Sequence, residues 1–173
     1  WDAPVAFSGD ASFVWPRSLH AEITARFGPQ RFDDVDEFGA EREGFHAQLA
    51  GALVDRIERR TELALWLLAR RPWSLFAVYF GESDTASHHL WSLWDERSPR
   101  HPALVDARTR DGLPRVYEAL DAAVGRLLAA AGGDAVELTI ASDHGSGGSS
   151  NKVLYLNRVL QDAGFLRMRR GGA

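Results

Sequence analysis

The sequence contains no cysteine, and Lys152 is the only lysine among its 20 basic residues. Without cysteine there can be no disulfide framework and no thiolate metal site, so any transition metal must be bound by histidine and carboxylate. The formal net charge is -4 and the pI is about 5.9, which argues against a general affinity for nucleic acid, whose polyanionic backbone favours a strongly basic face. We therefore expect no nucleic-acid partner.

Long apolar runs are also missing. No stretch approaches the ~20 apolar residues of a membrane-spanning helix, and no charged-then-apolar leader opens the chain, so the sequence indicates no membrane contact. Because the chain begins with Trp1, we interpret it as an internal piece whose native N-terminus, and any compartment signal with it, is absent. With 45% hydrophobic residues, 1–173 should form a single, partial α/β metallohydrolase domain. Nothing indicates an oligomeric state.

Apolar residues that repeat at helical spacing predict several helices. The second of these can be one helix or two, and glycines stop the others. The helices are expected at 16–28, 42–70, 114–132 and 156–163.

Two short apolar segments, 75–80 and 135–141, have the pattern of strands buried on both faces of a parallel sheet. Polar residues follow each segment directly, whereas 92–113 reads as a long surface excursion. The order strand, polar loop and helix occurs twice, which predicts an α/β fold: a mainly parallel sheet with helices on both faces. Such sheets place their ligands at the carboxyl ends of the strands, where both polar loops fall.

Asp84 and His88 stand four residues apart after the first predicted strand. One turn of backbone could bring a carboxylate oxygen and an imidazole nitrogen to one cation, a donor set that suits Zn²⁺ or Mn²⁺. The alternative is that the aspartate caps a helix and the histidine is a surface residue.

Asp143, His144 and Gly145 follow the second predicted strand. The glycine would help a sharp turn that brings both preceding side chains to one metal, although an Asx-type turn with an exposed histidine is an equal alternative. Two carboxylate and imidazole pairs at two strand ends together favour a shared metal centre.

The runs 78–88 and 140–145 resemble the type I phosphodiesterase and nucleotide pyrophosphatase branch of the alkaline phosphatase superfamily. The resemblance extends to the segments around Tyr117, around 155–164 and around 16–28, and so covers most of the chain. It implies a partial alkaline phosphatase-like core. The sequence departs from the family pattern at Ser87, where the family usually has glycine, and at Ser146, where methionine is common.

The resemblance implies two divalent metal ions, zinc with manganese as the alternative. Carried over residue by residue, Asp84 and His88 would bind one metal, and Asp143 and His144 the other. The family also needs an upstream aspartate, an upstream Thr or Ser nucleophile and a downstream histidine, for which the chain has no matching motif. The catalytic nucleophile would therefore lie outside this chain, and the chain alone should be inactive.

The implied function of the parent protein is a metal-dependent phosphoric ester hydrolase acting on a small phosphoester or nucleotide. In-line displacement between two cations would be its mechanism. A sulfatase or phosphomutase of the same superfamily is one alternative, because the same metals and carboxylate ligands serve related esters. The other is a non-catalytic α/β interaction domain, in which the two Asp and His pairs only cap helices and turns and lie apart.

The remaining histidines and the tryptophans have ordinary interpretations. His89 is taken as a bystander, and the other three as surface or structural residues: His20, His46 and His101. Three tryptophans could stack on a nucleotide base, but packing is the commoner role for such residues. They are Trp73, Trp91 and Trp94.

Overall fold

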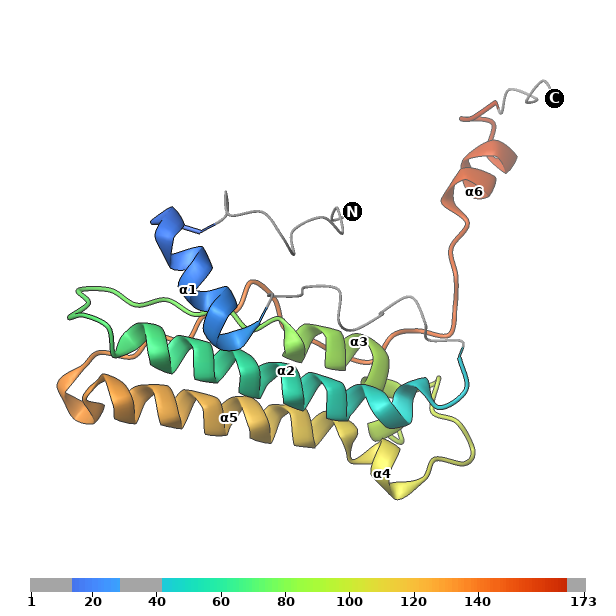
Figure 1. The fold of residues 1–173 in the computed structure, drawn as a ribbon. Helices are drawn as coiled ribbons and strands as arrows, with labels where there is room; N and C mark the ends of the chain where they lie inside the picture. Colours follow the sequence, from blue (N-terminus) through green and yellow to red (C-terminus); the bar gives the residue numbers. More distant parts are fainter. Residues whose placement is uncertain (1–13, 29–41, 168–173) are drawn as a thin grey trace.

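The computed structural model describes residues 14–28 and 42–167. Helices dominate this part of the chain (Figure 1). In chain order they are α1 (Arg17–Phe27), α2 (Phe45–Leu68), α3 (Glu82–Trp94), α4 (Ala107–Arg110), α5 (Gly112–Ala131), the 3₁₀ helix η4 (Gly133–Ala135) and α6 (Leu156–Asp162).

Three helices, α2, α3 and α5, pack side by side and form the body of the fold (Figure 1). α2 and α5 run in the same direction: a Cβ on Gly112 would lie 3.1 Å from the Cβ of Ala50, while further along both helices Arg126 pairs with Glu58 at 2.7 Å. α3 runs the opposite way along α2. α1 lies against the C-terminal half of α2, and α6 stands apart at the end of residues 136–155.

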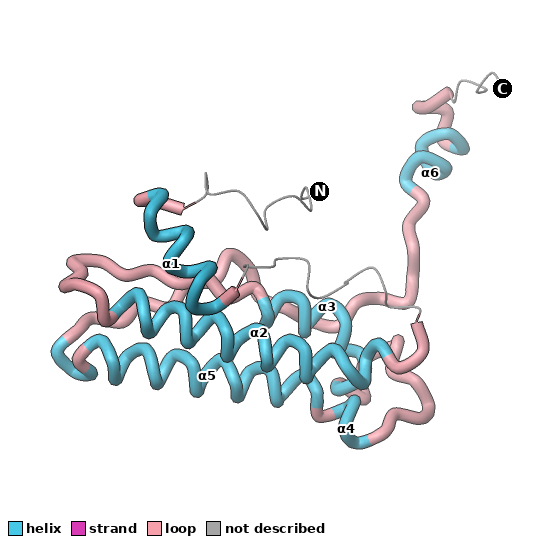
Figure 2. The backbone as a smooth tube through the Cα atoms, in the orientation of Figure 1, coloured by secondary structure: helices cyan, strands magenta, loops and turns pink. Residues whose placement is uncertain are grey.

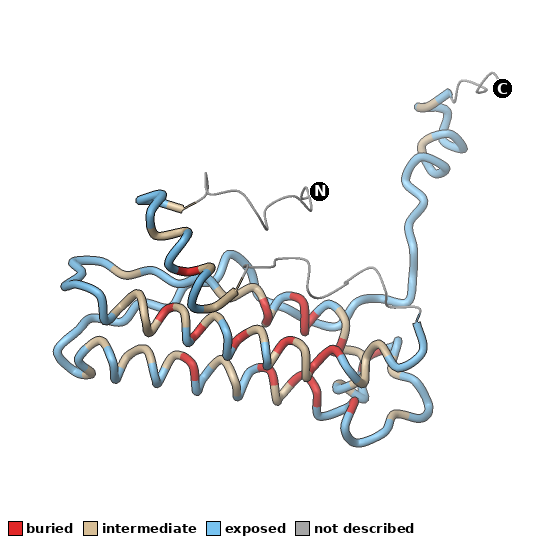
Figure 3. The backbone as a smooth tube through the Cα atoms, in the orientation of Figure 1, coloured by how far each residue is buried: buried red, intermediate tan, exposed pale blue. Residues whose placement is uncertain are grey.

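The apolar core lies between α2, α3 and α5, on the faces that Figure 3 shows as buried. The leucine and valine side chains at its centre are fully enclosed, and burial of each contributes about 1.5–3 kcal/mol relative to exposure. The core consists of Leu49, Ala50, Leu53, Ile57, Ala86, Leu90, Leu113, Val116 and Ala123.

The four predicted helices are present, and glycines stop three of them, α1, α5 and α6, where expected. Within 42–70 there is one helix, α2, rather than two. Gly28 has φ 77° and Gly132 has φ 120°, backbone conformations in which a side chain would be strained, so these two glycines end α1 and α5 at low cost. Helical periodicity was therefore a sound guide here.

The predicted mainly parallel sheet is wrong for the described part of the chain, in which no residue is assigned to a strand (Figure 2). Residues 75–80 are extended but lack regular structure, and η4 takes up the start of 135–141. A strand exists only when a neighbouring backbone accepts and donates its ladder hydrogen bonds, and an apolar run cannot supply that neighbour. Side chains expected in a sheet core are therefore exposed, with Leu75 at 82% and Ile140 at 74%.

The polar loop expected directly after 75–80 is also wrong, because α3 begins at Glu82. Residues 92–113 are only partly a surface excursion: they include the end of α3 and the short helix α4, and they bury Ser98, Thr109 and Leu113. Within 14–28 and 42–167, no helix is both long and apolar enough to cross a membrane.

Candidate functional site

Asp84 and His88 lie one turn apart on α3. Their spacing of four residues puts both side chains on the same face of the helix, because an α-helix repeats every 3.6 residues. The Nε2 atom of His88 lies 3.5 Å from Oδ1 of Asp84. Both side chains are accessible, since 49% of Asp84 and 73% of His88 is exposed.

Asp143 and His144 lie on the irregular segment that follows α5 and η4. His144 Nε2 is 3.8 Å from Asp143 Oδ2 and also 3.8 Å from Asp84 Oδ1, so the segment brings the second predicted pair against the first. The Asp84 carboxylate thus lies near both histidines, and Asp143 lies near His144. Asp143, at 90% exposed, projects furthest into solvent.

Local hydrogen bonds fix the orientation of His144. The Ser142 hydroxyl donates to the His144 carbonyl oxygen at 2.6 Å, and the ring Nδ1 donates to the Gly145 carbonyl oxygen at 3.0 Å. A carbonyl oxygen can only accept, so the neutral ring carries its proton on Nδ1 and leaves the Nε2 lone pair on the side of the two carboxylates. Histidines that bind metals commonly have this carbonyl partner on the other ring nitrogen.

The segment after His144 continues along α3. A Cβ on Gly148 would lie 3.4 Å from Nε1 of Trp91 and 3.8 Å from the Ser98 hydroxyl oxygen. The backbone therefore passes close to the indole ring, at a distance where a Cβ would make ordinary van der Waals contact. Close passage here helps to keep His144 beside Asp84.

The charge around His144 favours its protonated form. The hydrogen bond to the Gly145 carbonyl raises the pKa of the imidazole, and the carboxylates of Asp143 and Asp84 raise this pKa further. An arrangement that attracts a proton to Nε2 also attracts a divalent cation, because both are positive and both use the same lone pair.

The donor set fits a divalent transition cation. It offers carboxylate oxygen and imidazole nitrogen only, the ligand types that suit zinc and manganese. Two donors about 2.0–2.2 Å from a tetrahedral ion are themselves separated by roughly 3.4 Å, close to the 3.5 Å between Asp84 Oδ1 and His88 Nε2. However, in the described ranges no three His, Cys, Asp or Glu side chains are grouped so that they could hold one ion.

Ser87, one of the two departures from the family pattern, faces away from this group. Its hydroxyl donates to the Ser83 carbonyl oxygen at 2.7 Å and lies 3.3 Å from the hydroxyl of Tyr117 on α5. Only 7% of Ser87 is exposed. The serine side chain therefore joins α3 to α5 and does not obstruct approach to Asp84 and His88.

Sequence reasoning missed a buried ion-pair cluster two residues before Asp84. Glu82 is fully buried, and its carboxylate accepts hydrogen bonds from Arg56 Nε at 2.9 Å and Arg60 Nη1 at 3.1 Å. The Arg56 side chain is only 11% exposed. The spacing of four between the two arginines, on one face of α2, was the available signal.

Three of the other histidines have partners, which agrees with a structural role. The His101 ring donates from Nδ1 to the Ser92 carbonyl oxygen at 2.9 Å, and His89 packs edge-on against Phe45 with 5.3 Å between ring centroids. Burial lowers the pKa of His46, and the nearby His89 lowers it further. His20 is half-buried on α1.

The tryptophans make the contacts of packing residues. Trp73 donates from Nε1 to the Leu67 carbonyl oxygen at the end of α2, at 3.1 Å. Trp91 packs on the apolar core and meets Trp94 edge-on at 5.5 Å. Trp94 is 40% exposed, the most accessible of the three.

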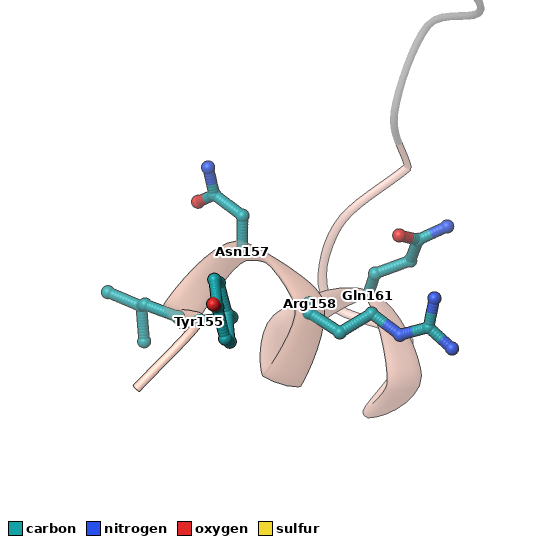
Figure 4. A pocket seen from close by; sticks show the side chains of 5 residues that line it. Tyr155, Asn157, Arg158 and Gln161 are labelled. Carbon is teal, nitrogen blue, oxygen red and sulfur yellow. The ribbon is translucent and has the colours of Figure 1, made fainter. Parts of the chain in front are cut away.

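Two hollows lie away from the Asp and His group. One is formed by α6 and its N-terminal flank, and Figure 4 shows its lining of Tyr155, Leu156, Asn157, Arg158 and Gln161. The other lies between α2 and the extended segment 73–79. Neither contains any of the four predicted site residues.

A family model, type I phosphodiesterase / nucleotide pyrophosphatase, matches residues 7–173. No curated protein and no solved structure matches the chain. The matched range contains both Asp and His pairs and nearly the whole sequence, which confirms the resemblance drawn from residues 78–88 and 140–145. The chain therefore belongs to the type I phosphodiesterase / nucleotide pyrophosphatase family.

Proposed function

We propose that this chain supplies half of a two-metal centre in a hydrolase of small phosphoesters or nucleotides. Asp84 and His88 would hold one divalent cation, and Asp143 and His144 the other, with zinc as the expected metal and manganese as the alternative. Family membership supports phosphoester hydrolysis. The observation that carries the proposal is the 3.8 Å approach of His144 Nε2 to Asp84 Oδ1, which joins the two motifs.

The cations, when bound, would neutralise charge on the phosphoryl oxygens and help ionise an attacking hydroxyl. The chain's own residues would bind and position these cations. The Asp84 and Asp143 carboxylates supply negative charge at an exposed position, and the Gly145 carbonyl holds the His144 ring with Nε2 free to bind. The nucleophile would be a Thr or Ser outside this chain.

Within enzymology, a sulfatase or phosphomutase would use the same kind of donors. The family match favours the phosphodiesterase. The residues that would discriminate between a phosphate and a sulfate ester are not among the four donors. The rates of hydrolysis of the two kinds of ester therefore have to be compared.

A non-catalytic interaction domain predicts that the two Asp and His pairs lie apart. Asp84 is the third residue of α3 and not its N-cap, which is Gly81. Its carboxylate lies instead between two histidines, at 3.5 Å from His88 and 3.8 Å from His144. This arrangement favours ligand binding over capping.

The test is turnover of bis(4-nitrophenyl) phosphate by the full-length protein, with 4-nitrophenyl sulfate as the competing ester. We expect zinc-dependent hydrolysis of the phosphodiester, and Asp143→Asn should lower it by more than the roughly 10–100-fold that outer-shell changes cause. Asp121→Asn, an exposed aspartate on α5, is the control and should keep full activity. Zinc-independent turnover, or equal activity of Asp143→Asn and wild type, would contradict the proposal.

A further inference from the structure

Glu82 is a fully buried carboxylate at the first position of α3. Removing a carboxylate from water is costly unless it is paired and hydrogen-bonded, and here Arg56 and Arg60 both satisfy it. A buried ion pair of this kind is weak support for stability, because its desolvation cost can match its attraction, so a role in fixing one geometry is the better explanation.

Arg60 holds two parts of the chain at once. Its Nη1 atom donates to Glu82 Oε2 at 3.1 Å and to the Tyr79 carbonyl oxygen at 3.2 Å. Tyr79 belongs to the extended segment before α3, and Glu82 opens the helix. One guanidinium therefore fixes the direction in which the chain enters α3, as its planar fork of donors allows.

Gly81 packs closely against the Tyr79 side chain just before α3 begins. A Cβ at this position would lie 3.0 Å from the Tyr79 hydroxyl and 3.3 Å from its ring. The opposite side of the first turn is held by Ser87, whose hydroxyl bonds the Ser83 carbonyl and faces Tyr117 on α5. The turn that carries Asp84 is thus attached to α2 on one side and to α5 on the other.

We propose that Glu82 is a positioning residue for the metal centre: through Arg56 and Arg60 it fixes the first turn of α3 and so the place of the Asp84 carboxylate. Asp84 is half exposed and has no covalent or core constraint of its own, so its position depends on the turn beneath it. The inference rests on the proposed function, since it concerns how a metal ligand is held.

The test measures zinc binding to the full-length protein by calorimetry, with the visible absorption spectrum of the Co²⁺-substituted protein as a second readout. Glu82→Gln keeps the side-chain volume and removes the charge that both arginines bind. We expect its zinc affinity to fall on the order of tenfold and its cobalt bands to change, as outer-shell substitutions do. Arg60→Lys keeps the charge but loses the fork, and should show the same change more weakly.

Glu58→Gln is the matched control. It is the same substitution in a glutamate of α2 that also pairs with an arginine, Arg126, but its partner lies on α5 rather than in the turn that carries Asp84. Its zinc affinity and cobalt spectrum should equal those of wild type. Unfolding curves recorded for each variant show whether it is folded.

Wild-type zinc affinity and cobalt bands in both Glu82→Gln and Arg60→Lys would overturn the inference and leave the proposed function standing. An equal loss in Glu82→Gln and Glu58→Gln would also overturn it, because the effect would then be general loosening of α2. If Glu82→Gln does not fold, the zinc affinity and cobalt bands of Arg60→Lys alone test the inference. If the wild-type protein binds no zinc, the proposed function fails and the inference with it.

Discussion

The Oδ1 atom of Asp84 lies between the Nε2 atoms of His88 and His144, at 3.5 Å and 3.8 Å. His88 is on the same helix, whereas His144 comes from a segment beyond α5. One carboxylate therefore contacts an imidazole from each of the two motifs. Its charge acts on both, which makes Asp84 the most informative single residue of the group.

Asp84→Asn should weaken zinc binding at both motifs. The substitution keeps the shape of the side chain but removes the negative charge, and a neutral amide is a poor ligand beside a carboxylate. We expect the first zinc equivalent to lose more than about tenfold in affinity and the second to weaken by a smaller factor. Competition with a chromophoric chelator measures both steps, and unaltered affinity for both would contradict a shared role.

Leu53→Ala should destabilise the protein through its core. Leu53 is fully buried between α2 and its neighbours, and truncating a buried leucine costs about 2–5 kcal/mol in the free energy of unfolding. Leu104→Ala is the control, because Leu104 is 92% exposed and should change stability by less than about 0.5 kcal/mol. Urea unfolding compares them; similar midpoints would mean that the three-helix core is wrong.

Ser87→Ala should affect stability and spare the reaction. It removes the hydroxyl that bonds the Ser83 carbonyl and faces Tyr117, at a cost of about 1 kcal/mol in the free energy of unfolding. The KM for a phosphodiester should be unchanged, since the side chain points toward α5. A large change in KM at unchanged stability would place Ser87 in the substrate site instead.

Acid stability should depend on Asp106, which caps α4. Its carboxylate accepts a hydrogen bond from the Thr109 backbone N–H at 3.0 Å. Hydrogen bonding from the Thr109 side chain, and then from this backbone N–H, lowers the pKa of Asp106 below its ordinary value of 3.8. The charged form is favoured by folding, so its contribution is present above the unfolded pKa and is lost as pH falls through the lowered one.

Asp106→Asn keeps an acceptor oxygen but cannot titrate. We therefore expect its melting temperature to fall less steeply than that of wild type between about pH 4 and pH 2. Melting curves recorded across this range compare the two slopes. Parallel slopes would show that Asp106 does not contribute to acid unfolding.

Sequence patterns predicted α1, α2, α5 and α6, though not α3 or α4, because a helix satisfies its own backbone. The apolar spacing of Leu49, Leu53 and Ile57 along α2, and glycines such as Gly28 and Gly132 at the ends of α1 and α5, carry the necessary information locally. The sheet could not be predicted in the same way. Residues 75–80 have the composition of a buried strand, but a strand also needs a partner backbone, and composition does not identify one.

The candidate site likewise combines a local feature, which sequence spacing predicts, with a contact that depends on the tertiary fold. The spacing of Asp84 and His88 is a local property and predicted their proximity on one turn. The approach of His144 to Asp84 is a tertiary contact, which was expected from a shared sheet edge but arises here from a segment that runs along α3. The Glu82 cluster escaped notice because the burial of a charged side chain depends on partners that only the fold assembles.

The most direct test of a two-metal centre is the zinc content of the purified full-length protein, measured by inductively coupled plasma mass spectrometry in wild type, His88→Ala and His144→Ala. We predict two zinc ions per wild-type chain, with each substitution lowering the content toward one, because the two histidines serve different ions. Equal zinc content in all three proteins, or none in wild type, would contradict the assignment of Asp84, His88, Asp143 and His144 as metal ligands.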